Sequence, residues 1–147
     1  MTSKRSFIFI LFFLTSLALP SFTAATTYYV SPSGNDSADG FALETTFKTI
    51  QKAVDVAQPG DTIMLAPGEY RQDVISRRNG SLATPITITG PVEAVIKGGG
   101  NDRVIEINHD YHILNGFTID GLYGSATKAS NYRDILMENA GFQGKSR

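Results

Sequence analysis

The stretch Phe47–Arg71 reads F-K-T-I-Q-K-A-V-D-V-A-Q-P-G-D-T-I-M-L-A-P-G-E-Y-R and decides the fold. Its first half predicts a short amphipathic helix, because apolar residues recur at spacings of three and four and share one helical stripe. These residues are Phe47, Ile50, Val54 and Ala57. The sequence Gln58-Pro59-Gly60 ends the helix, since proline disfavours helical geometry in the residue before it and glycine tolerates the reversal.

The second half of the stretch changes its apolar period to two, which predicts a β-strand. Ile63 and Leu65 fall on one side of this strand, and Thr62 and Met64 on the other. Pro67-Gly68 then turns the chain. A lone helix with one apolar face must cover something, and we expect this one to cap the open end of a stack of β-coils.

Short strands with glycine-rich breaks follow, and they repeat. Strands are predicted at residues 26–30, 85–89, 94–97, 104–108, 112–120 and 134–139. Apolar segments begin at Ile63, Ile86, Ile113 and Ile135, at intervals of 23, 27 and 22 residues. The pair Val95-Ile96 resembles Thr118-Ile119 in the same way. Repetition every 20 to 30 residues or so is typical of a solenoid.

The predicted fold class is therefore all-β: a right-handed parallel β-helix of about four coils with an N-terminal capping helix. In this fold each coil pairs with the next through parallel ladders, and inward Ile, Val and Leu side chains stack in columns. An ordinary β-sandwich is the alternative, but these strands are short for a sandwich and the repeat is unexpected there.

The first 25 residues are expected to be a signal peptide rather than part of the fold. Lys4 and Arg5 precede an apolar run, and small residues at Thr23-Ala24-Ala25 suit cleavage after Ala25. The alternative is a membrane anchor, but Phe7–Leu19 has 13 residues against about 20 for a spanning helix. Residues 26–147 then form a secreted, extracellular β-helix domain.

The net charge limits the classes of partner, and the lack of cysteine limits what can hold the domain together. Without Lys4 and Arg5 the chain has 11 basic residues against 14 acidic ones, a net charge of −3. This balance gives no reason to expect nucleic acid or an anionic membrane as a partner. No cysteine is present, so the core and the backbone ladders must hold the domain together.

Several segments resemble the opening of secreted right-handed parallel β-helix proteins of the pectin-lyase-like type. They are Y-Y-V-S-P-S-G-N-D with Asp39-Gly40, F-K-T-I-Q-K-A-V, P-G-D-T-I-M-L-A-P-G-E-Y-R, P-I-T-I-T, I-K-G-G-G and Y-H-I-L-N-G-F-T-I-D-G. The nearest relatives by this resemblance are polysaccharide lyases: family-nine pectate lyases, and family-six chondroitinase and alginate lyases. The resemblance covers Thr26–Gly121.

The resemblance implies a protein that binds or cleaves acidic extracellular polysaccharide. In these lyases the calcium ligands and the basic residue that abstracts the C5 proton lie on later coils, so no catalytic residue is transferred to this chain. Calcium is expected only in a full-length lyase, and this chain is expected to hold no cofactor. Two alternatives stay open: a non-catalytic carbohydrate-binding β-helix, and a fragment without its own activity.

β-Elimination beside a uronate needs a cation that neutralises the uronate carboxylate and a base that takes the proton. The chain offers carboxylates as candidate ligands of the cation and basic residues as candidates for the base. The carboxylates are Glu69, Asp73, Asp102, Glu106, Asp110 and Asp120, and the basic residues are Arg71, Arg77, Arg78, Lys97 and Arg103. Glu106 alternates with Ile105 and Ile107 and should point outward. The simpler interpretation is that all these residues are solvated charges on the outer face.

Other polar residues suggest sites that simpler structure also explains. Asn35, Ser37, Asp39 and Gly40 partly imitate a calcium loop, but Thr46 stands where the closing Glu belongs, which favours a hydrogen-bonded turn. His109 and His112 lack further ligands, so turn or surface histidines are expected rather than a metal site. Asn108, Asn115 and Asn139 could stack between coils. Asn35 and Asn79 lie in N-glycosylation sequons and are glycosylation sites if the source is a eukaryote.

The C-terminal end of the chain predicts an open coil. Gly141–Arg147 supplies no second capping helix, so the β-helix is expected to be incomplete there. An uncapped coil presents open ladder groups and apolar side chains. Residues 26–147 alone are therefore expected to be marginally stable or to self-associate through that coil.

Overall fold

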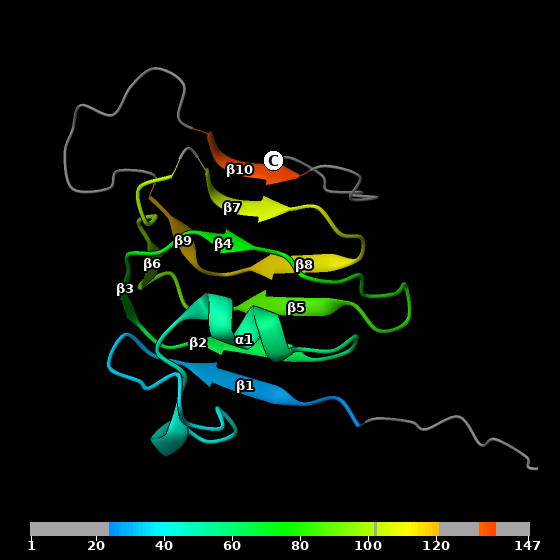
Figure 1. Cartoon of the computed structure of the whole chain (residues 1–147), viewed down its shortest axis with the longest axis horizontal. Coiled ribbons are helices and arrows are strands. Elements are labelled where there is room, and N and C mark those ends of the chain that lie inside the picture. Colours follow the sequence, from blue (N-terminus) through cyan, green and yellow to red (C-terminus); the bar gives the residue numbers. More distant parts are fainter. Residues whose placement is uncertain (1–23, 102, 121–132, 138–147) are drawn as a thin grey trace, which may run out of the picture.

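The computed structural model describes residues 24–101 and 103–120, and the backbone of 133–137. Strands dominate it (Figure 1). They are β1 (Thr27–Val30), β2 (Thr62–Leu65), β3 (Gly68–Tyr70), β4 (Val74–Ile75), β5 (Ile86–Thr89), β6 (Ala94–Ile96), β7 (Arg103–Ile107), β8 (His112–Asn115), β9 (Thr118–Ile119) and β10 (Arg133–Met137). The helices are the 3₁₀ turn η1 (Leu43–Thr45) and the α-helix α1 (Ile50–Val56).

The strands form three parallel sheets, which the chain visits in turn. Sheet A has the order β1-β2-β5-β8, sheet B has β3-β6-β9, and sheet C has β10-β7-β4. From β2 onward each strand in a sheet pairs in parallel with the strand three places later in the sequence. In Figure 1 the coils rise from β1 at the bottom to β10 at the top. This is a parallel β-helix, as the repeat predicted.

The observed strands correct the prediction in two places. The predicted strand at 112–120 is two strands, because Gly116 adopts a φ of 88° between β8 and β9 and turns the chain from sheet A to sheet B. The short strands β3 and β4 were not predicted, because two or three residues carry too little periodicity.

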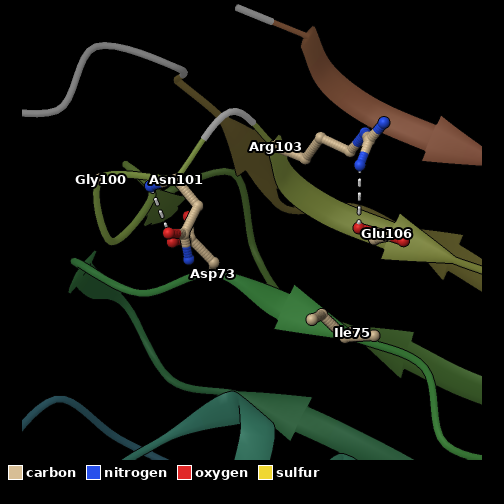
Figure 2. A pocket seen from close by; sticks show the side chains of 6 residues that line it. All are labelled: Asp73, Ile75, Gly100, Asn101, Arg103 and Glu106. Carbon is tan, nitrogen blue, oxygen red and sulfur yellow. Dashed lines mark hydrogen bonds and ion pairs between the residues drawn. The ribbon is translucent and has the colours of Figure 1, made fainter.

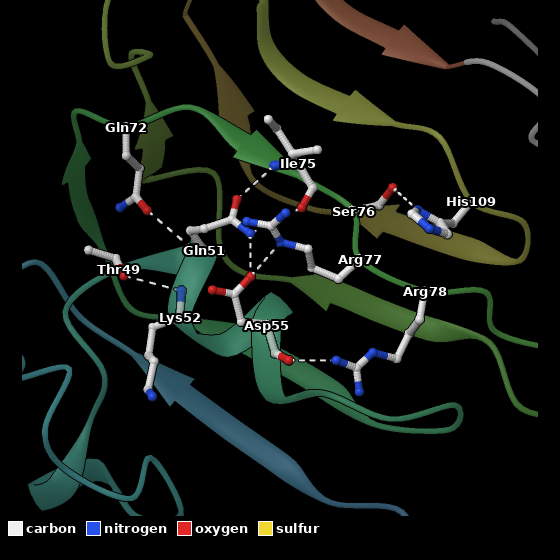
Figure 3. Close-up of polar contacts among 10 residues, drawn as sticks. All are labelled: Thr49, Gln51, Lys52, Asp55, Gln72, Ile75, Ser76, Arg77, Arg78 and His109. Carbon is white, nitrogen blue, oxygen red and sulfur yellow. Dashed lines mark hydrogen bonds and ion pairs between the residues drawn. The ribbon is translucent and has the colours of Figure 1, made fainter.

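Helix α1 lies between β1 and β2 in the sequence and packs against β1, β2 and β4 in space. Of the predicted apolar stripe, Phe47 and Ala57 are buried but lie outside the helix. Phe47 instead forms a parallel bridge with Val30. The helix begins late because the Thr49 side chain accepts a hydrogen bond from the Lys52 backbone N–H, which makes Thr49 the N-cap (Figure 3).

The core is built from inward columns that cross successive strands. In sheet A, Ile63 pairs with Ile88, and Ile88 pairs with Leu114. In sheet B, Ile96 pairs with Ile119 and Val95 with Thr118, so the predicted likeness of these two segments is confirmed.

The isoleucines that revealed the repeat do not form one column. Ile86 pairs with His112, while Ile113 pairs with Thr87 and is 44% exposed. The sequence intervals found the coils but missed the register, because a shift of one residue turns a strand's side chain to the other face.

No helix among the described residues is long and apolar enough to cross a membrane. The predicted open end at Gly141–Arg147 lies outside the described residues, as does most of the signal segment, so both stay predictions.

Candidate functional site

One candidate site is a hollow on the outer face of sheet C, beside the loop that joins β6 to β7 (Figure 2). Its volume is about 370 Å³. We call this cavity the sheet C hollow. Six residues line it: Asp73, Ile75, Gly100, Asn101, Arg103 and Glu106. They come from the turn before β4, from β4 itself, from the β6–β7 loop and from β7.

Asp73 orders the loop at one side of the hollow. Its Oδ1 accepts a hydrogen bond from the Gly99 backbone N–H at 2.7 Å, and its Oδ2 accepts one from the Asn101 N–H at 3.1 Å. Gly99 makes the approach feasible, since a Cβ there would lie 2.8 Å from the Asp73 carboxylate. Both oxygens of Asp73 therefore hold backbone, which positions Asn101 at the rim.

Arg103 and Glu106 form the opposite side of the hollow. The guanidinium Nη1 of Arg103 lies 3.4 Å from Glu106 Oε2, and the Asn108 side-chain amide donates to Glu106 Oε1 at 2.9 Å. Glu106 stands between the buried residues Ile105 and Ile107 and points outward, so that prediction is confirmed. The Arg103 side chain is 43% exposed, so part of its donor set faces water.

The hollow can recognise a polar ligand better than it can break a bond. Arg103 offers a planar guanidinium that suits a carboxylate, and Asn101 carries an amide that can donate and accept. Asp73 and Glu106 are already engaged by donors of the chain. No histidine or lysine lines this hollow in the described part of the chain.

A second set of predicted charges gathers on the outer face of sheet B. Lys97 Nζ lies 2.8 Å from Glu69 Oε1 and 3.9 Å from Asp120 Oδ2, and Arg71 Nη2 lies 3.3 Å from Glu69 Oε2. The hydrogen bond and the charge of Lys97 hold the pKa of Glu69 below its ordinary value. These are exposed ion pairs, which contribute little to stability.

The remaining predicted charges do not join either set. Arg77 Nε donates to Asp55 Oδ1 at 2.8 Å, and Arg78 Nη2 donates to the Asp55 carbonyl at 2.6 Å, so both contact α1 (Figure 3). Burial raises the pKa of Asp55, but hydrogen bonds from Gln51 and Arg77 outweigh it and leave the pKa lowered. The backbone N–H of Asp110 donates to Asn79 Oδ1, and its carbonyl accepts from the Gly80 N–H. Asp102 lies outside the described residues.

The two histidines belong to different environments. His109 Nδ1 lies 2.7 Å from the hydroxyl of the buried Ser76, a partner that the sequence did not suggest (Figure 3). His112 is 9% exposed, with Nε2 hydrogen-bonded to the Arg78 carbonyl at 3.0 Å. The expectation of a turn or surface position is therefore wrong for His112, because its place on β8 faces inward. Burial is the main reason that its pKa is lowered.

The loop with a partial calcium pattern is a network of hydrogen bonds. Asp39 Oδ1 accepts from the Phe41 N–H and from the Thr45 hydroxyl, and Asn35 Oδ1 accepts from the Ser37 N–H. The expected hydrogen-bonded turn is confirmed. Among the described residues no three His, Asp or Glu side chains are grouped as metal ligands.

The described asparagines that the sequence singled out lie on strands or loops at the surface. Asn35 and Asn79 are exposed, and their glycosylation stays a prediction. Asn115 pairs with Thr89, so the neighbouring strand offers it no asparagine to stack on. Asn139 lies outside the described residues.

A family model matches residues 32–139, most of the chain, and its description is "Protein of unknown function (DUF1565)". The chain belongs to this family. Among curated proteins, this member of the DUF1565 family is similar to the uncharacterized protein YwoF of Bacillus subtilis (strain 168), with 32% identity over 114 residues. The match covers 69% of this chain and 24% of YwoF, so the chain spans about a quarter of that relative's length.

Two solved structures resemble this DUF1565 protein in fold. One is a rhamnogalacturonan lyase, with a TM-score of 0.50 and 21% identity over 65% of this chain and 28% of that one. The other is a GH136 lacto-N-biosidase from Eubacterium ramulus, with a TM-score of 0.54 and 20% identity over 69% of this chain and 22% of that one. At this level of identity the likeness establishes the parallel β-helix fold and nothing finer.

Proposed function

We propose that this chain is the N-terminal part of a secreted right-handed β-helix that binds acidic extracellular polysaccharide through the sheet C hollow. In this proposal α1 closes the N-terminal end of about four coils. By the resemblance of Thr26–Gly121 to polysaccharide lyases of families nine and six, any calcium ligands and catalytic base lie on coils beyond this chain.

The observation that carries the proposal is that the half-exposed guanidinium of Arg103 and the amide of Asn101 line the same polar hollow. A uronate presents a carboxylate and ring hydroxyls, which a guanidinium and an amide bind by hydrogen bonds. The contact of Arg103 with Glu106 is long, at 3.4 Å, and exposed. A ligand carboxylate can therefore compete for the same guanidinium at small cost.

The comparisons support a carbohydrate ligand without fixing its identity. The rhamnogalacturonan lyase and the lacto-N-biosidase share this fold, and both are named for action on carbohydrate. Each is several times longer than the part that this chain matches. Binding is therefore proposed for the hollow, and bond cleavage for the whole protein.

Binding is tested with affinity electrophoresis of the natural protein through gels that contain polygalacturonate, alginate or chondroitin sulfate, with dextran as the neutral control. We expect retardation by at least one acidic glycan, and the substitution Arg103→Gln should weaken it about tenfold, the loss of one charge-assisted contact. Arg71→Gln is the matched control, since Arg71 is a similarly exposed arginine that directly follows β3. Equal retardation of wild type and Arg103→Gln would refute the hollow as the binding site.

The whole protein is either a lyase or a non-catalytic binding protein, and one assay separates the two. Release of unsaturated uronate by the natural protein with calcium present identifies a lyase. Retardation without product identifies a non-catalytic binding module.

A further inference from the structure

The N-terminal end of β1 rests on a buried carboxylate. The backbone N–H of Thr26 donates to Asp61 Oδ1 at 2.8 Å, and the Gln58 N–H donates to Asp61 Oδ2 at 2.7 Å. The Asp61 residue is 4% exposed. Asp61, 35 positions further along the sequence, thus accepts a hydrogen bond from the backbone N–H at the start of the β-helix.

Asp61 is fixed in place by its own backbone. It follows the turn that ends α1, where its N–H donates to the Gln58 carbonyl at 3.0 Å. Its carbonyl accepts from the Thr87 N–H at 3.0 Å, which ties it to sheet A. The carboxylate therefore cannot swing into solvent without breaking the turn or the sheet.

This buried carboxylate lacks a cationic partner in the described part of the chain. The ion pairs in that part are made by Arg71, Arg77, Lys97 and Arg103, none of them with Asp61. A buried charge is costly unless an opposite charge and hydrogen bonds compensate it. Two amide N–H groups supply the hydrogen bonds, and the position beside Thr26 N is where a positive charge would complete the site.

The sequence places a cleavage signal at this nitrogen. Ala24 and Ala25 are exposed, follow Thr23, and match the small residues that signal peptidase accepts. We propose that the Ala25–Thr26 peptide bond is hydrolysed and that the new α-ammonium of Thr26 forms an ion pair with Asp61. Water adds across the bond, the Ala25 side leaves as a carboxylate, and the Thr26 amine takes up a proton.

The site needs little rearrangement to accept the new terminus. The Thr26 carbonyl already accepts the Thr62 N–H at 2.8 Å, and Thr27 pairs with Thr62 in sheet A. These contacts hold the Thr26 nitrogen where it is, so cleavage converts an amide donor into a charged donor at the same place. An ammonium adds a Coulomb attraction to the Asp61 carboxylate that a neutral amide N–H lacks, and burial strengthens this attraction. Removal of residues 1–25 would therefore stabilise the first coil, which has no earlier coil to pair with.

The inference rests on the proposed secretion and is tested separately from glycan binding. Mass spectrometry of the protein secreted by its natural host should show Thr26 as the first residue. For the ion pair, the natural protein is released from an N-terminal fusion to begin at either Thr26 or Ala25. The Ala25 form keeps a neutral amide at Thr26 and is the matched control, because it differs only in one small exposed residue.

Both forms are compared with and without Asp61→Asn by thermal unfolding and by hydrogen exchange at the Thr62 amide. We expect Thr62 protection to be several-fold higher in the Thr26 form, and this difference to vanish in Asp61→Asn. The start residue and Asp61 would then be coupled. A secreted protein that begins elsewhere, or that retains residues 1–25, overturns the cleavage. Equal protection in the Thr26 and Ala25 forms overturns the ion pair, and this comparison does not depend on how well Asp61→Asn folds.

Discussion

The side chain of Gln51 hydrogen-bonds to both backbone polar groups of Ile75. Its Oε1 accepts the Ile75 N–H at 2.8 Å, and its Nε2 donates to the Ile75 carbonyl at 3.1 Å (Figure 3). Ile75 belongs to β4, the edge strand of sheet C, and Gln51 belongs to the helix beside that edge. A primary amide has the same donor and acceptor as a peptide group, so Gln51 stands in for a neighbouring strand.

Helix and strand support each other in both directions. Gln72, in the turn before β4, accepts the Ile50 N–H through Oε1 at 2.7 Å and so satisfies a free donor of the first helical turn. The edge of sheet C and the start of α1 are thus joined by two glutamines. Unpaired edges invite association with other chains, and this contact protects one of them.

Replacing Gln51 with alanine should loosen the edge of β4. The two hydrogen bonds to Ile75 are lost together with the one from Gln51 Nε2 to Asp55 Oδ1, and at roughly 0.5–1.5 kcal/mol each the cost is about 1.5–4.5 kcal/mol. In native-state hydrogen exchange, the protection of the Ile75 amide should fall by about tenfold or more. Lys48→Ala, at an exposed position before the helix, is the control. Unchanged protection in Gln51→Ala would show that the amide does not stabilise the strand.

Asp36 should stabilise the start of α1 from a distant loop. Its Oδ1 accepts the Lys48 and Thr49 N–H groups, each at 2.8 Å, and its Oδ2 accepts the Thr49 hydroxyl at 2.8 Å. Asp36→Ala should lower the free energy of unfolding by about 1.5–3 kcal/mol, the range for bonds to a charged group. Chemical denaturation measures the loss. Glu44→Ala, an exposed carboxylate on η1, should change stability by less than about 0.5 kcal/mol.

Acidification should destabilise the fold through His112. Burial lowers its pKa below the ordinary value of 6.5 in the folded state, so the unfolded chain binds the proton more readily. The contribution is intact above pH 6.5 and declines as the pH falls from 6.5 toward the folded-state pKa. Between pH 7.5 and 5 the unfolding temperature should fall less in His112→Gln than in wild type. The difference corresponds to the uptake of at most about one proton on unfolding. Parallel curves would contradict this.

Asp73 should control the shape of the sheet C hollow more than global stability. Asp73→Ala removes both acceptors that hold the loop, and these bonds are exposed. Hydrogen exchange at the Gly99 amide should become faster, and glycan retardation should weaken, while the unfolding temperature changes little. Glu93→Ala, an exposed carboxylate on the turn before β6, is the control. Faster exchange with unchanged retardation would show that the loop takes no part in binding.

Gly116 should not tolerate a side chain. Its φ is 88°, and a Cβ there would collide with the Gly90 carbonyl oxygen of the neighbouring coil. Gly116→Ala should therefore cost about 1–3 kcal/mol from backbone strain, before the collision is counted. Asn115→Ala, one residue earlier and exposed, is the control. Equal denaturation midpoints for the two variants would contradict the corner geometry.

Local patterns predicted much of the fold. The repeat of short apolar segments identified the parallel coils, the helix at Phe47–Ala57 was found with its start three residues early, and Glu106 was placed outward. These features depend on neighbours in the sequence, where side-chain period and turn residues act directly. The register failed at Ile113, because a turn's length decides which face a residue takes.

The sequence by itself determined that this chain would form stacked parallel coils behind one amphipathic helix. Only the tertiary structure decided which polar residues meet. Asp73 and Arg103 come together in the hollow, Gln51 reaches Ile75, and Asp61 receives Thr26. The physical reason is that these partners are 24 to 35 positions apart in the sequence, so the stacking of the coils, not local spacing, brings them together.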